Sequence, residues 1–455
     1  MTRLSQSLPP NSRLPSYRAL QKRYRLGPQT IRQAVSILVN RGLVVTRPGQ
    51  GSFTAPVRRP DRTAGDPSWQ TLVLGSRHRL SHQLPWLIQP APPGVLPLAN
   101  AYLDEALQPI GLITAAAARA ARRPLTWTRQ PVEGMPELRA CFAREVGGGL
   151  RADHVLVTSG GQAALTAVFR YLAEPGDPVV LESPTYGGAV IAARAAGLHP
   201  VPVPTDRDGV LPDALSYALE HTRARLIYLQ TRHANPTGAT LAEDRRPAVL
   251  DAAARARAFV VEDDWVRDLD LTSSVPVPLA AHDEDGHVVY VRSLTKPVAA
   301  GLRVAALMAR GPAFERLRLG RTSDDLFVAP ILQQTALDVL TAPGWPRHLA
   351  GVHRVLRERR DALLTALDRH APHLRPEVVP AGGVLLWLRL PDGVPATRLV
   401  AACQERGLAV EPGDWYFPGE PGGSFVRLSY AAAEAGVMAT AATVLADAAR
   451  DLSDG

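Results

Sequence analysis

A rare lysine comes just after a strongly apolar run in the stretch Val288-Val-Tyr-Val-Arg-Ser-Leu-Thr-Lys-Pro-Val-Ala-Ala-Gly-Leu-Arg303. The chain has 51 basic side chains, of which only Lys22 and Lys296 are lysines. A chain that uses arginine for positive charge keeps a lysine where arginine cannot do the same chemistry. A buried lysine amine can lose its proton and form a Schiff base, which a guanidinium cannot. Lys296 is therefore the first candidate for a reactive residue.

The neighbours of Lys296 indicate the group that it would bind. The apolar run Val288–Val291 predicts a buried strand, so Lys296 follows the C-terminal end of a strand, where open α/β sheets hold their ligands. Ser293 and Arg303 flank the lysine with a hydroxyl and a guanidinium, which suit a phosphate. A carbonyl cofactor that carries a phosphate and is held by an imine to lysine is pyridoxal phosphate.

Lys296 has two alternative interpretations. Taken alone, it could equally be a surface lysine in a loop. The spacing Ser-x-x-Lys also occurs in penicillin-binding enzymes, which need a Lys-Thr-Gly motif elsewhere in the chain. Neither lysine of this chain is followed by Thr-Gly, so that class is excluded.

Length and composition set the broad class. A chain of 455 residues predicts two or three domains. It has neither a run of 18 apolar residues nor a signal peptide, so we expect a cytoplasmic protein without membrane segments. Cys141 and Cys403 lack metal-ligand spacing, so we expect buried thiols and no metal site.

Charge is concentrated at the N-terminus. The first 60 residues carry 11 basic and no acidic side chains, whereas the other 395 carry 40 basic and 43 acidic ones. An all-basic module of this size is typical of a protein that binds a polyanion such as nucleic acid. A disordered basic tail is the alternative, and the regular apolar pattern of the segment argues against it.

That N-terminal pattern predicts a winged helix-turn-helix. Ser16 is a good N-cap for a first helix, and Pro28 suits the first turn of a second one. The second helix is amphipathic, with apolar residues at helical spacing from Ile31 to Val39. Two short strands, Leu43–Thr46 and Ser52–Thr54, follow on either side of a glycine-containing turn.

This module resembles the GntR-type DNA-binding domain. The resemblance rests on Leu14-Pro-Ser, Thr30-Ile-Arg-Gln-Ala, Arg41-Gly-Leu-Val and Arg47-Pro-Gly-Gln-Gly-Ser-Phe, and covers residues 8–54. It implies that double-stranded DNA is a partner, with contacts from Arg18, Gln29, Thr30 and Arg32 and with Gly49 in the wing tip. There are two departures: the family's first helix is expected to be missing here, and Pro28 stands where the family usually has arginine.

The rest of the chain predicts an α/β fold. Residues 56–95 are rich in proline and arginine and are expected to form a linker, with short helices near Trp69–Leu74 and Leu80–Ile88. From residue 96 onward strands alternate with alanine-rich helices, which predicts a mostly parallel sheet covered on both faces. The expected strands are Val155–Thr158, Val179–Leu181, Leu226–Gln230, Phe259–Val261, Val288–Val291 and Val304–Met308. After Pro330 the pattern becomes that of a smaller α+β domain.

Polar motifs follow several of these strands. Ser159-Gly-Gly-Gln162 opens a helix, whose N-terminal N–H groups can hold a phosphate. Glu182-Ser-Pro-Thr-Tyr186, His233-Ala-Asn-Pro-Thr-Gly238 and Glu262-Asp-Asp-Trp265 come after three others. A carboxylate at the last of these can keep a pyridinium nitrogen protonated. Any one motif could be a plain turn or a solvated acidic loop, but their joint occurrence at strand ends indicates one site.

Residues 96–455 resemble fold-type I pyridoxal phosphate enzymes of the aspartate aminotransferase superfamily. The matching motifs, in order, are Gly134-x-x-x-Leu-Arg139, Gly160-Gly-Gln162, Pro184-Thr-Tyr186, Asn235-Pro-Thr-Gly238, Asp263-Asp264, Ser293-x-x-Lys296, Arg303 and Phe425-Val-Arg427-Leu-Ser. Together with the N-terminal module, the whole chain resembles the MocR subfamily of GntR-type regulators. The expected domains are the winged module at 1–55, the linker at 56–95, a large cofactor-binding domain at 96–330 and a small domain at 331–455.

The resemblance implies a role for each matching residue. Lys296 would hold the cofactor covalently and move protons, and Asp263 would pair with the pyridine nitrogen. Asn235 would bind the ring hydroxyl and Tyr186 would stack on the ring. The phosphate would be held by Gly161, Gln162, Ser293 and Arg303. Arg427 would grip a substrate carboxylate with two parallel contacts, the alternative being a surface arginine on an edge strand.

The resemblance also implies an assembly and leaves two functions open. Sites of this fold are completed by a second subunit, so we expect a homodimer in which Trp127 or Arg129 approaches the partner's lysine. The leading interpretation is a transcriptional regulator that senses an amino compound or the cofactor. The alternative is an active aminotransferase with an incomplete DNA-binding module. Trp265 stands where the family usually has tyrosine, and an indole N–H can donate but cannot act as an acid, which favours the regulator.

Overall fold

The computed structural model describes residues 4, 8–47, 50–55, 66–74, 91–273 and 276–453. The chain divides into two compact units, Met1–Arg77 and His78–Gly455. Three expectations concern positions outside the described residues: the wing-tip Gly49, the short helix near Leu80–Ile88, and most of the segment where the family's first helix would lie.

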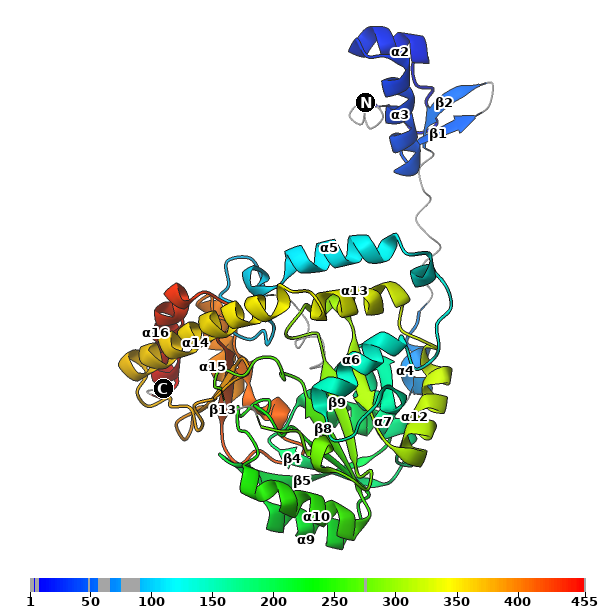
Figure 1. The fold of residues 1–455 in the computed structure, drawn as a ribbon. Coiled ribbons are helices and arrows are strands. Elements are labelled where there is room, and N and C mark those ends of the chain that lie inside the picture. The colour runs from blue at the N-terminus through cyan, green and yellow to red at the C-terminus, as the bar shows by residue number, and fades with distance from the viewer. Residues whose placement is uncertain are drawn as a thin grey trace. The chain divides into compact units, whose positions relative to one another are not determined.

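The first unit has the winged helix-turn-helix architecture expected from the sequence (Figure 1). Its elements are α2 (Tyr17–Tyr24), α3 (Pro28–Asn40), β1 (Val44–Arg47), β2 (Gly51–Thr54) and the separate short helix α4 (Trp69–Leu74). Ser16 caps α2, since its Oγ accepts a hydrogen bond from the N–H of Ala19 at 3.3 Å, and Pro28 begins α3. The apolar stripe that predicted α3 is buried at Ile31, Val35 and Leu38.

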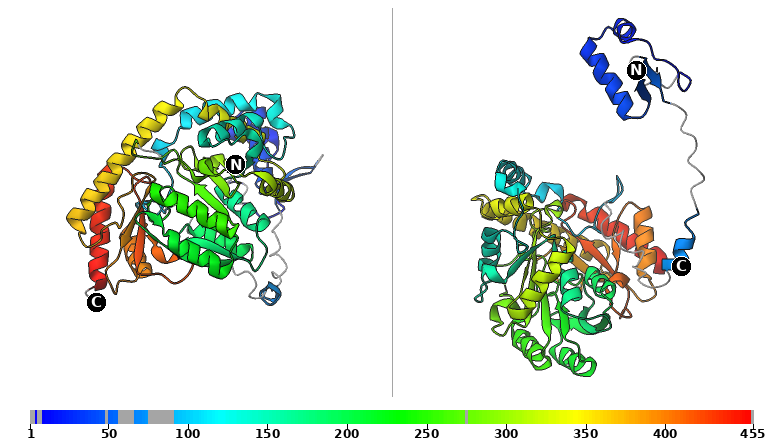
Figure 2. Two further views of the ribbon diagram at one scale, coloured as in Figure 1. Left: turned by 60° about the horizontal axis from the view of Figure 1, so that its bottom comes forward. Right: turned by 90° about the vertical axis from the view of Figure 1, so that its right-hand side faces the viewer.

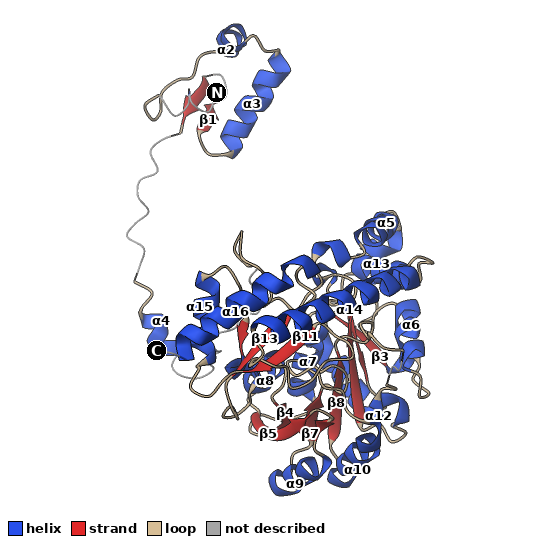
Figure 3. Cartoon of the chain, turned by 90° about the vertical axis from the view of Figure 1, so that its left-hand side faces the viewer, coloured by secondary structure: helices blue, strands red, loops and turns tan. Residues whose placement is uncertain are grey.

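The second unit is built on an eight-stranded, mostly parallel sheet with the order β3-β10-β9-β8-β7-β4-β5-β6 (Figures 1 and 3). Only β10, which is antiparallel to β3 and β9, and β6, which is antiparallel to β5, depart from the parallel arrangement. The strands are β3 (Val155–Thr158), β4 (Pro178–Ser183), β5 (His199–Asp206), β6 (Gly209–Val210), β7 (Leu226–Leu229), β8 (Phe259–Asp264), β9 (Val288–Ser293) and β10 (Ala305–Met308).

Both faces of this sheet are buried under helices, because alternate residues of each strand enter two different cores. Val179 and Leu181 of β4 pack with α7, α8 and α12, whereas Val180 packs on the opposite face with α6, α9, α10 and α13. The helices of this part are α5 (Ile110–Ala121), α6 (Pro136–Val146), α7 (Gly161–Tyr171), α8 (Gly187–Ala195), α9 (Pro212–Thr222), α10 (Arg246–Ala256), α11 (Leu279–His282), α12 (Gly311–Asp324) and α13 (Pro330–Leu340).

The C-terminal part forms an α+β layer (Figure 2), and its core also takes in buried residues from the segments 98–107 and 265–271. A three-stranded antiparallel sheet, in the order β11-β13-β12, packs against long helices. The elements are α14 (Trp345–His370), β11 (Leu385–Arg389), α15 (Ala396–Glu405), β12 (Glu411–Pro412), β13 (Phe425–Ser429) and α16 (Met438–Ser453). Among the described residues, no helix is long and apolar enough to span a bilayer.

Three strands were not expected from the sequence: β5 and the two-residue strands β6 and β12. β5 contains Pro200, Pro202 and Pro204, and proline usually argues against a strand because it lacks an N–H. Here the strand pairs in parallel with β4 along its length and needs only short pairing with β6 on its other side. β12 is two residues long, too short to give any periodic signal.

Candidate functional site

Lys296 lies just after β9, beyond the carboxyl ends of the parallel strands, as the sequence predicted. Its Nζ is 3.4 Å from the centroid of the Tyr102 ring and 5.7 Å from that of Trp265. Burial lowers the pKa of the amine to about 7, with further lowering from the positive charges of Arg427 and Arg303. A large share of Lys296 amines is therefore unprotonated and nucleophilic near neutral pH.

The three consecutive carboxylates at the end of β8 are separated by the alternation of the strand. Asp263 points to the same face as Tyr228, whose hydroxyl donates to Asp263 Oδ2 at 2.7 Å, and Gln230 Nε2 donates to the same oxygen at 3.1 Å. Burial raises the pKa of Asp263 to about 6, against the lowering effect of these two hydrogen bonds. Asp263 is thus a positioned, buried carboxylate on the Lys296 side of the sheet.

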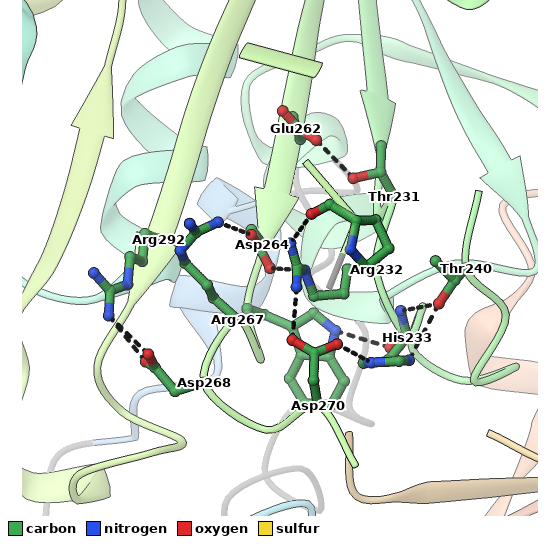
Figure 4. A network of polar contacts seen from close by, with 12 residues as sticks. Thr231, Arg232, His233, Thr240, Glu262, Asp264, Arg267, Asp268, Asp270 and Arg292 are labelled. Atoms are coloured by element: carbon green, nitrogen blue, oxygen red, sulfur yellow. Dashed lines mark hydrogen bonds and ion pairs between the residues drawn. The ribbon is translucent and has the colours of Figure 1, made fainter. Parts of the chain in front are cut away.

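Glu262 and Asp264 point to the other face, where they form hydrogen bonds and an ion pair with neighbouring segments of the chain (Figure 4). Glu262 Oε1 accepts from the hydroxyl of Thr231 at 2.7 Å and from the N–H of Leu279 at 2.9 Å. Asp264 contacts Arg232, with 3.2 Å between Oδ1 and Nε, and accepts from the hydroxyl of Tyr290 at 2.6 Å. These two carboxylates are therefore engaged within the protein and are not free for a ligand.

The charged network of Figure 4 also supports the loop that carries Asn235. Arg232 Nη1 is 2.6 Å from Asp270 Oδ2, and His233 Nε2 is 2.8 Å from Asp270 Oδ1. His233 Nδ1 lies 3.1 Å from the hydroxyl of Thr240. The residues just before Asn235 are thus held by the buried Arg232–Asp270 ion pair and by the side-chain contacts of His233.

A second group of predicted residues forms a cradle at the start of α7. Gly160 has φ +95°, and a Cβ on it would lie 2.5 Å from Nη2 of Arg303. The Cβ position of the next residue, Gly161, is 3.9 Å from the hydroxyl of Ser293. A guanidinium, a hydroxyl and the N-terminal N–H groups of a helix thus lie together, an arrangement suited to a phosphate.

Gln162 and Tyr186 contact each other at the same edge of the sheet. The Tyr186 hydroxyl donates to Gln162 Oε1 at 3.1 Å, and Gln162 Nε2 donates to the carbonyl of Gly188 at 2.9 Å. Because both ends of the Gln162 amide are engaged, the part of Gln162 that remains for a phosphate is its backbone N–H. Burial raises the pKa of the Tyr186 hydroxyl, so this ring stays neutral.

Arg427 of β13 contacts Asn235. Its Nη1 donates to Asn235 Oδ1 at 3.1 Å, and its Nη2 donates to the carbonyl of Ala99 at 2.7 Å. The guanidinium also forms an ion pair with Glu411 of β12 and lies 5.0 Å from the centroid of the Tyr416 ring. The Arg427 side chain is buried, so the alternative of a surface arginine is wrong.

Trp265 is buried beside this site, and its indole N–H is occupied. Nε1 donates to the carbonyl of His233 at 3.1 Å. The place that the resemblance assigns to a tyrosine hydroxyl therefore offers neither an acidic proton nor a free donor.

In the first unit, Arg18 lies on α2, and Gln29, Thr30 and Arg32 lie in the first turns of α3. All four side chains are exposed. Their exposure near the start of the second helix agrees with the part of a helix-turn-helix that reaches base edges and phosphates.

The residues around Lys296 fit pyridoxal phosphate. An amine with a lowered pKa, a buried carboxylate at a strand end and a phosphate cradle that a Cβ on Gly160 would fill are the donors that such a group requires. These groups come from β8, β9, the start of α7 and the segment after β9, and the fold brings them together.

Sequence reasoning missed several residues that border the site. Tyr102 and Ala99 come from the segment before α5, Tyr228 from within a buried strand, and Glu411 from a two-residue strand. Only Tyr228 left a signal, as the one hydroxyl-bearing residue in the apolar run Leu226–Leu229. The others are brought in by the tertiary fold.

Comparisons with known proteins match both units. Residues 98–445 match the family Aminotransferase class I and II, and residues 3–54 match Bacterial regulatory proteins, gntR family. A 2-aminoadipate transaminase of Thermus thermophilus is 35% identical over 344 residues, which are 74% of this chain and 86% of that protein. The uncharacterized HTH-type transcriptional regulator YisV of Bacillus subtilis is 27% identical over 447 residues, which are 97% of this chain and 92% of that one.

Among solved structures, the chain is similar to an alpha-aminoadipate aminotransferase of Thermus thermophilus complexed with N-(5'-phosphopyridoxyl)-L-leucine. The TM-score is 0.77 at 32% identity, and the match covers 83% of this chain and 96% of that one.

Proposed function

The chain belongs to the aminotransferase class I and II family and carries a gntR-family regulatory domain, and we propose that it is a MocR-type transcriptional regulator whose DNA binding responds to an amino compound or to pyridoxal phosphate. One observation carries the proposal: the same chain that holds a reactive lysine beside a phosphate cradle also presents an all-basic winged module. A regulator needs both a ligand site and a DNA-binding surface.

In this proposal the residues around Lys296 each contact one part of pyridoxal phosphate or of its ligand. Pyridoxal phosphate, when bound, supplies an aldehyde for amines and an electron-withdrawing ring. Lys296 offers its amine, Asp263 holds the ring nitrogen and Asn235 the ring hydroxyl. Tyr186 packs on the ring. Gly161, Gln162, Ser293 and Arg303 hold the phosphate, and Arg427 faces the part of the ligand that lies beyond the reacting amine.

Trp265 supports sensing over efficient catalysis. Its N–H is already bound to the carbonyl of His233, so it cannot assist proton transfer at the cofactor's ring hydroxyl. Binding of the cofactor does not depend on such a proton. The site is therefore suited to capture a ligand amine with slow turnover.

The proposal extends to DNA, assembly and location. Arg18, Gln29, Thr30 and Arg32, with Gly49 in the wing, would contact an operator in the cytoplasm. The expected domain limits are 1–55, 56–95, 96–330 and 331–455, but α13 packs on the large sheet, so the small domain would begin at α14 (Trp345–His370). A homodimer would complete the cofactor sites and present two winged modules to a two-part operator.

The test is a gel shift with DNA from the protein's own upstream region. Full-length protein should shift this fragment, and protein that lacks residues 1–60 should not. The cofactor should be detected by visible absorbance in both preparations. A shift that survives the deletion would contradict the assignment of DNA binding to the winged module.

A further inference from the structure

The guanidinium expected to grip a ligand carboxylate already has a carboxylate of the protein. Arg427 pairs with Glu411, and both side chains are buried. The Glu411 oxygen that faces Arg427 also accepts a hydrogen bond from the hydroxyl of Tyr416. The charge that would attract an anionic ligand is thus neutralised from within the protein.

This pairing is fixed by the backbone. Glu411 and Arg427 are directly opposite each other in the antiparallel pairing of β12 with β13. Side chains of directly opposed residues are neighbours on the same face of a sheet. The Tyr416 hydroxyl donates to the same oxygen of Glu411 that pairs with Arg427, and so holds the carboxylate in place.

The pairing also occupies the geometry that a carboxylate would use. A carboxylate binds a guanidinium through two parallel N–H groups, either Nη1 with Nη2 or Nε with Nη2. Nη2 of Arg427 takes part in both arrangements, and it contacts Glu411 and donates to the carbonyl of Ala99. Nε is buried without a hydrogen-bond partner among the described residues. A ligand carboxylate could therefore accept a single hydrogen bond from Arg427, but it would not find two free N–H groups side by side.

We propose that Glu411 makes this site selective for amines that lack a carboxylate on the carbon bearing the amino group. The inference rests on the proposed function, in which an amino compound is taken at Lys296, and it names the class of that compound. An α-carboxylate at Arg427 would lie against the buried carboxylate of Glu411, and like charges brought together away from water are strongly unfavourable. An amine without this group leaves the Arg427–Glu411 pair intact, so selectivity arises from rejection of the other class.

The experiment uses full-length, cofactor-loaded protein and two probes that differ by one carboxylate, leucine and 3-methylbutan-1-amine. Dissociation constants are read at equilibrium from the change in cofactor absorbance. The wild-type protein should bind the amine at least about tenfold more tightly than leucine. Glu411→Gln removes the charge, so it should bind leucine about tenfold more tightly than wild type does, and the preference of the wild type for the amine over leucine should be lost.

Glu377→Gln is the matched control, because Glu377 pairs with Arg389 in a mainly exposed ion pair. It should leave both dissociation constants unchanged. A second readout is calorimetry with 4-methylpentanoate, which has the carboxylate but no amine and does not react with the cofactor. It should bind Glu411→Gln more tightly than the wild type.

Leucine binding to the wild type as tight as binding of the amine would overturn the inference. So would a Glu411→Gln protein, folded by its melting curve, that binds leucine more weakly than wild type, since Glu411 would then serve to orient Arg427 for carboxylates. Protein that takes up no cofactor would count against the proposed function. The 4-methylpentanoate comparison would still decide the inference in that case, because equal binding to both proteins contradicts it.

Discussion

The Lys296 amine lies among groups that shift its pKa in opposite directions. Burial and the charges of Arg427 and Arg303 lower its pKa, while Glu411 and Asp263 raise it, and the result is a pKa of about 7. An exposed lysine would be protonated at every physiological pH. The lowered pKa makes the Lys296 amine nucleophilic near neutral pH, and it is caused by the surroundings of the side chain.

Attachment of pyridoxal phosphate to the apo protein should therefore depend on pH near neutrality. Below the pKa the amine is protonated and unreactive, so the rate should rise through about pH 7 and level off by about pH 8. Stopped-flow absorbance measures this rate. A rate that continues to rise towards the ordinary lysine pKa would show that the amine is not perturbed.

Lys296→Arg is the control, because it keeps the charge and removes the nucleophile. Cofactor should not become fixed to this variant by borohydride. Fixation on the variant would place the attachment at another residue.

At the level of single residues, sequence could indicate the partners that are close in the chain or at strand ends. One short segment contains Ser293, Lys296 and Arg303, so the sequence alone could indicate that they bind the same phosphate-bearing cofactor. Glu411 was not, because its meaning depends on lying opposite Arg427 in a strand of two residues. Tyr102 likewise reaches Lys296 only through the packing of a distant segment.

Among the elements, the start of α7 brings the phosphate cradle together. Gly160→Ala should weaken cofactor binding by about tenfold or more, because its φ is +95° and the new Cβ would meet the Arg303 guanidinium. Equilibrium titration of visible absorbance measures the change.

Gly149→Ala is a suitable control for that variant. Gly149 also has a positive φ of +71°, but a Cβ there would meet no heavy atom within 4 Å. It should leave cofactor affinity unchanged. Equal losses in both variants would mean that backbone strain, and not the cradle, is being measured.

In the winged module, α2 carries the predicted phosphate contact Arg18. Each such contact contributes roughly −0.9 to the slope of log affinity against log salt, so Arg18→Ala should make the slope shallower by about 1. Arg375→Ala, an exposed arginine of the other unit, should not alter it. Binding measured by fluorescence anisotropy at several salt concentrations decides this, and an unchanged slope for Arg18→Ala would remove the residue from the interface.

Apolar runs identified six strands of this sheet but not the strand richest in proline. The six strands expected from apolar runs are present with small shifts of their ends, whereas β5, which contains three prolines, was not expected. The alternation of β8 explains another limit. The run Glu262-Asp-Asp264 could be identified as a carboxylate motif, but the division of its members between two faces follows from the register in the sheet.

For the whole molecule, the proposed homodimer has an exposed candidate surface. Leu125 and Trp127 are 73% and 67% exposed in the single chain, in the segment expected to approach the partner. Sedimentation velocity at micromolar concentration should show a dimer, and Leu125→Asp should weaken it. Tyr217→Asp is the control, since Tyr217 is similarly exposed on α9. A wild-type monomer that holds the cofactor would contradict the proposed assembly.

The central claim is that the ligand site at Lys296 controls DNA binding by the winged module. The most direct measurement is the affinity of full-length protein for its upstream DNA, with and without pyridoxal phosphate, for wild type and for Lys296→Arg. We expect the cofactor to change the DNA affinity of the wild type and to leave that of Lys296→Arg unchanged. Equal responses of the two proteins to the cofactor would contradict it.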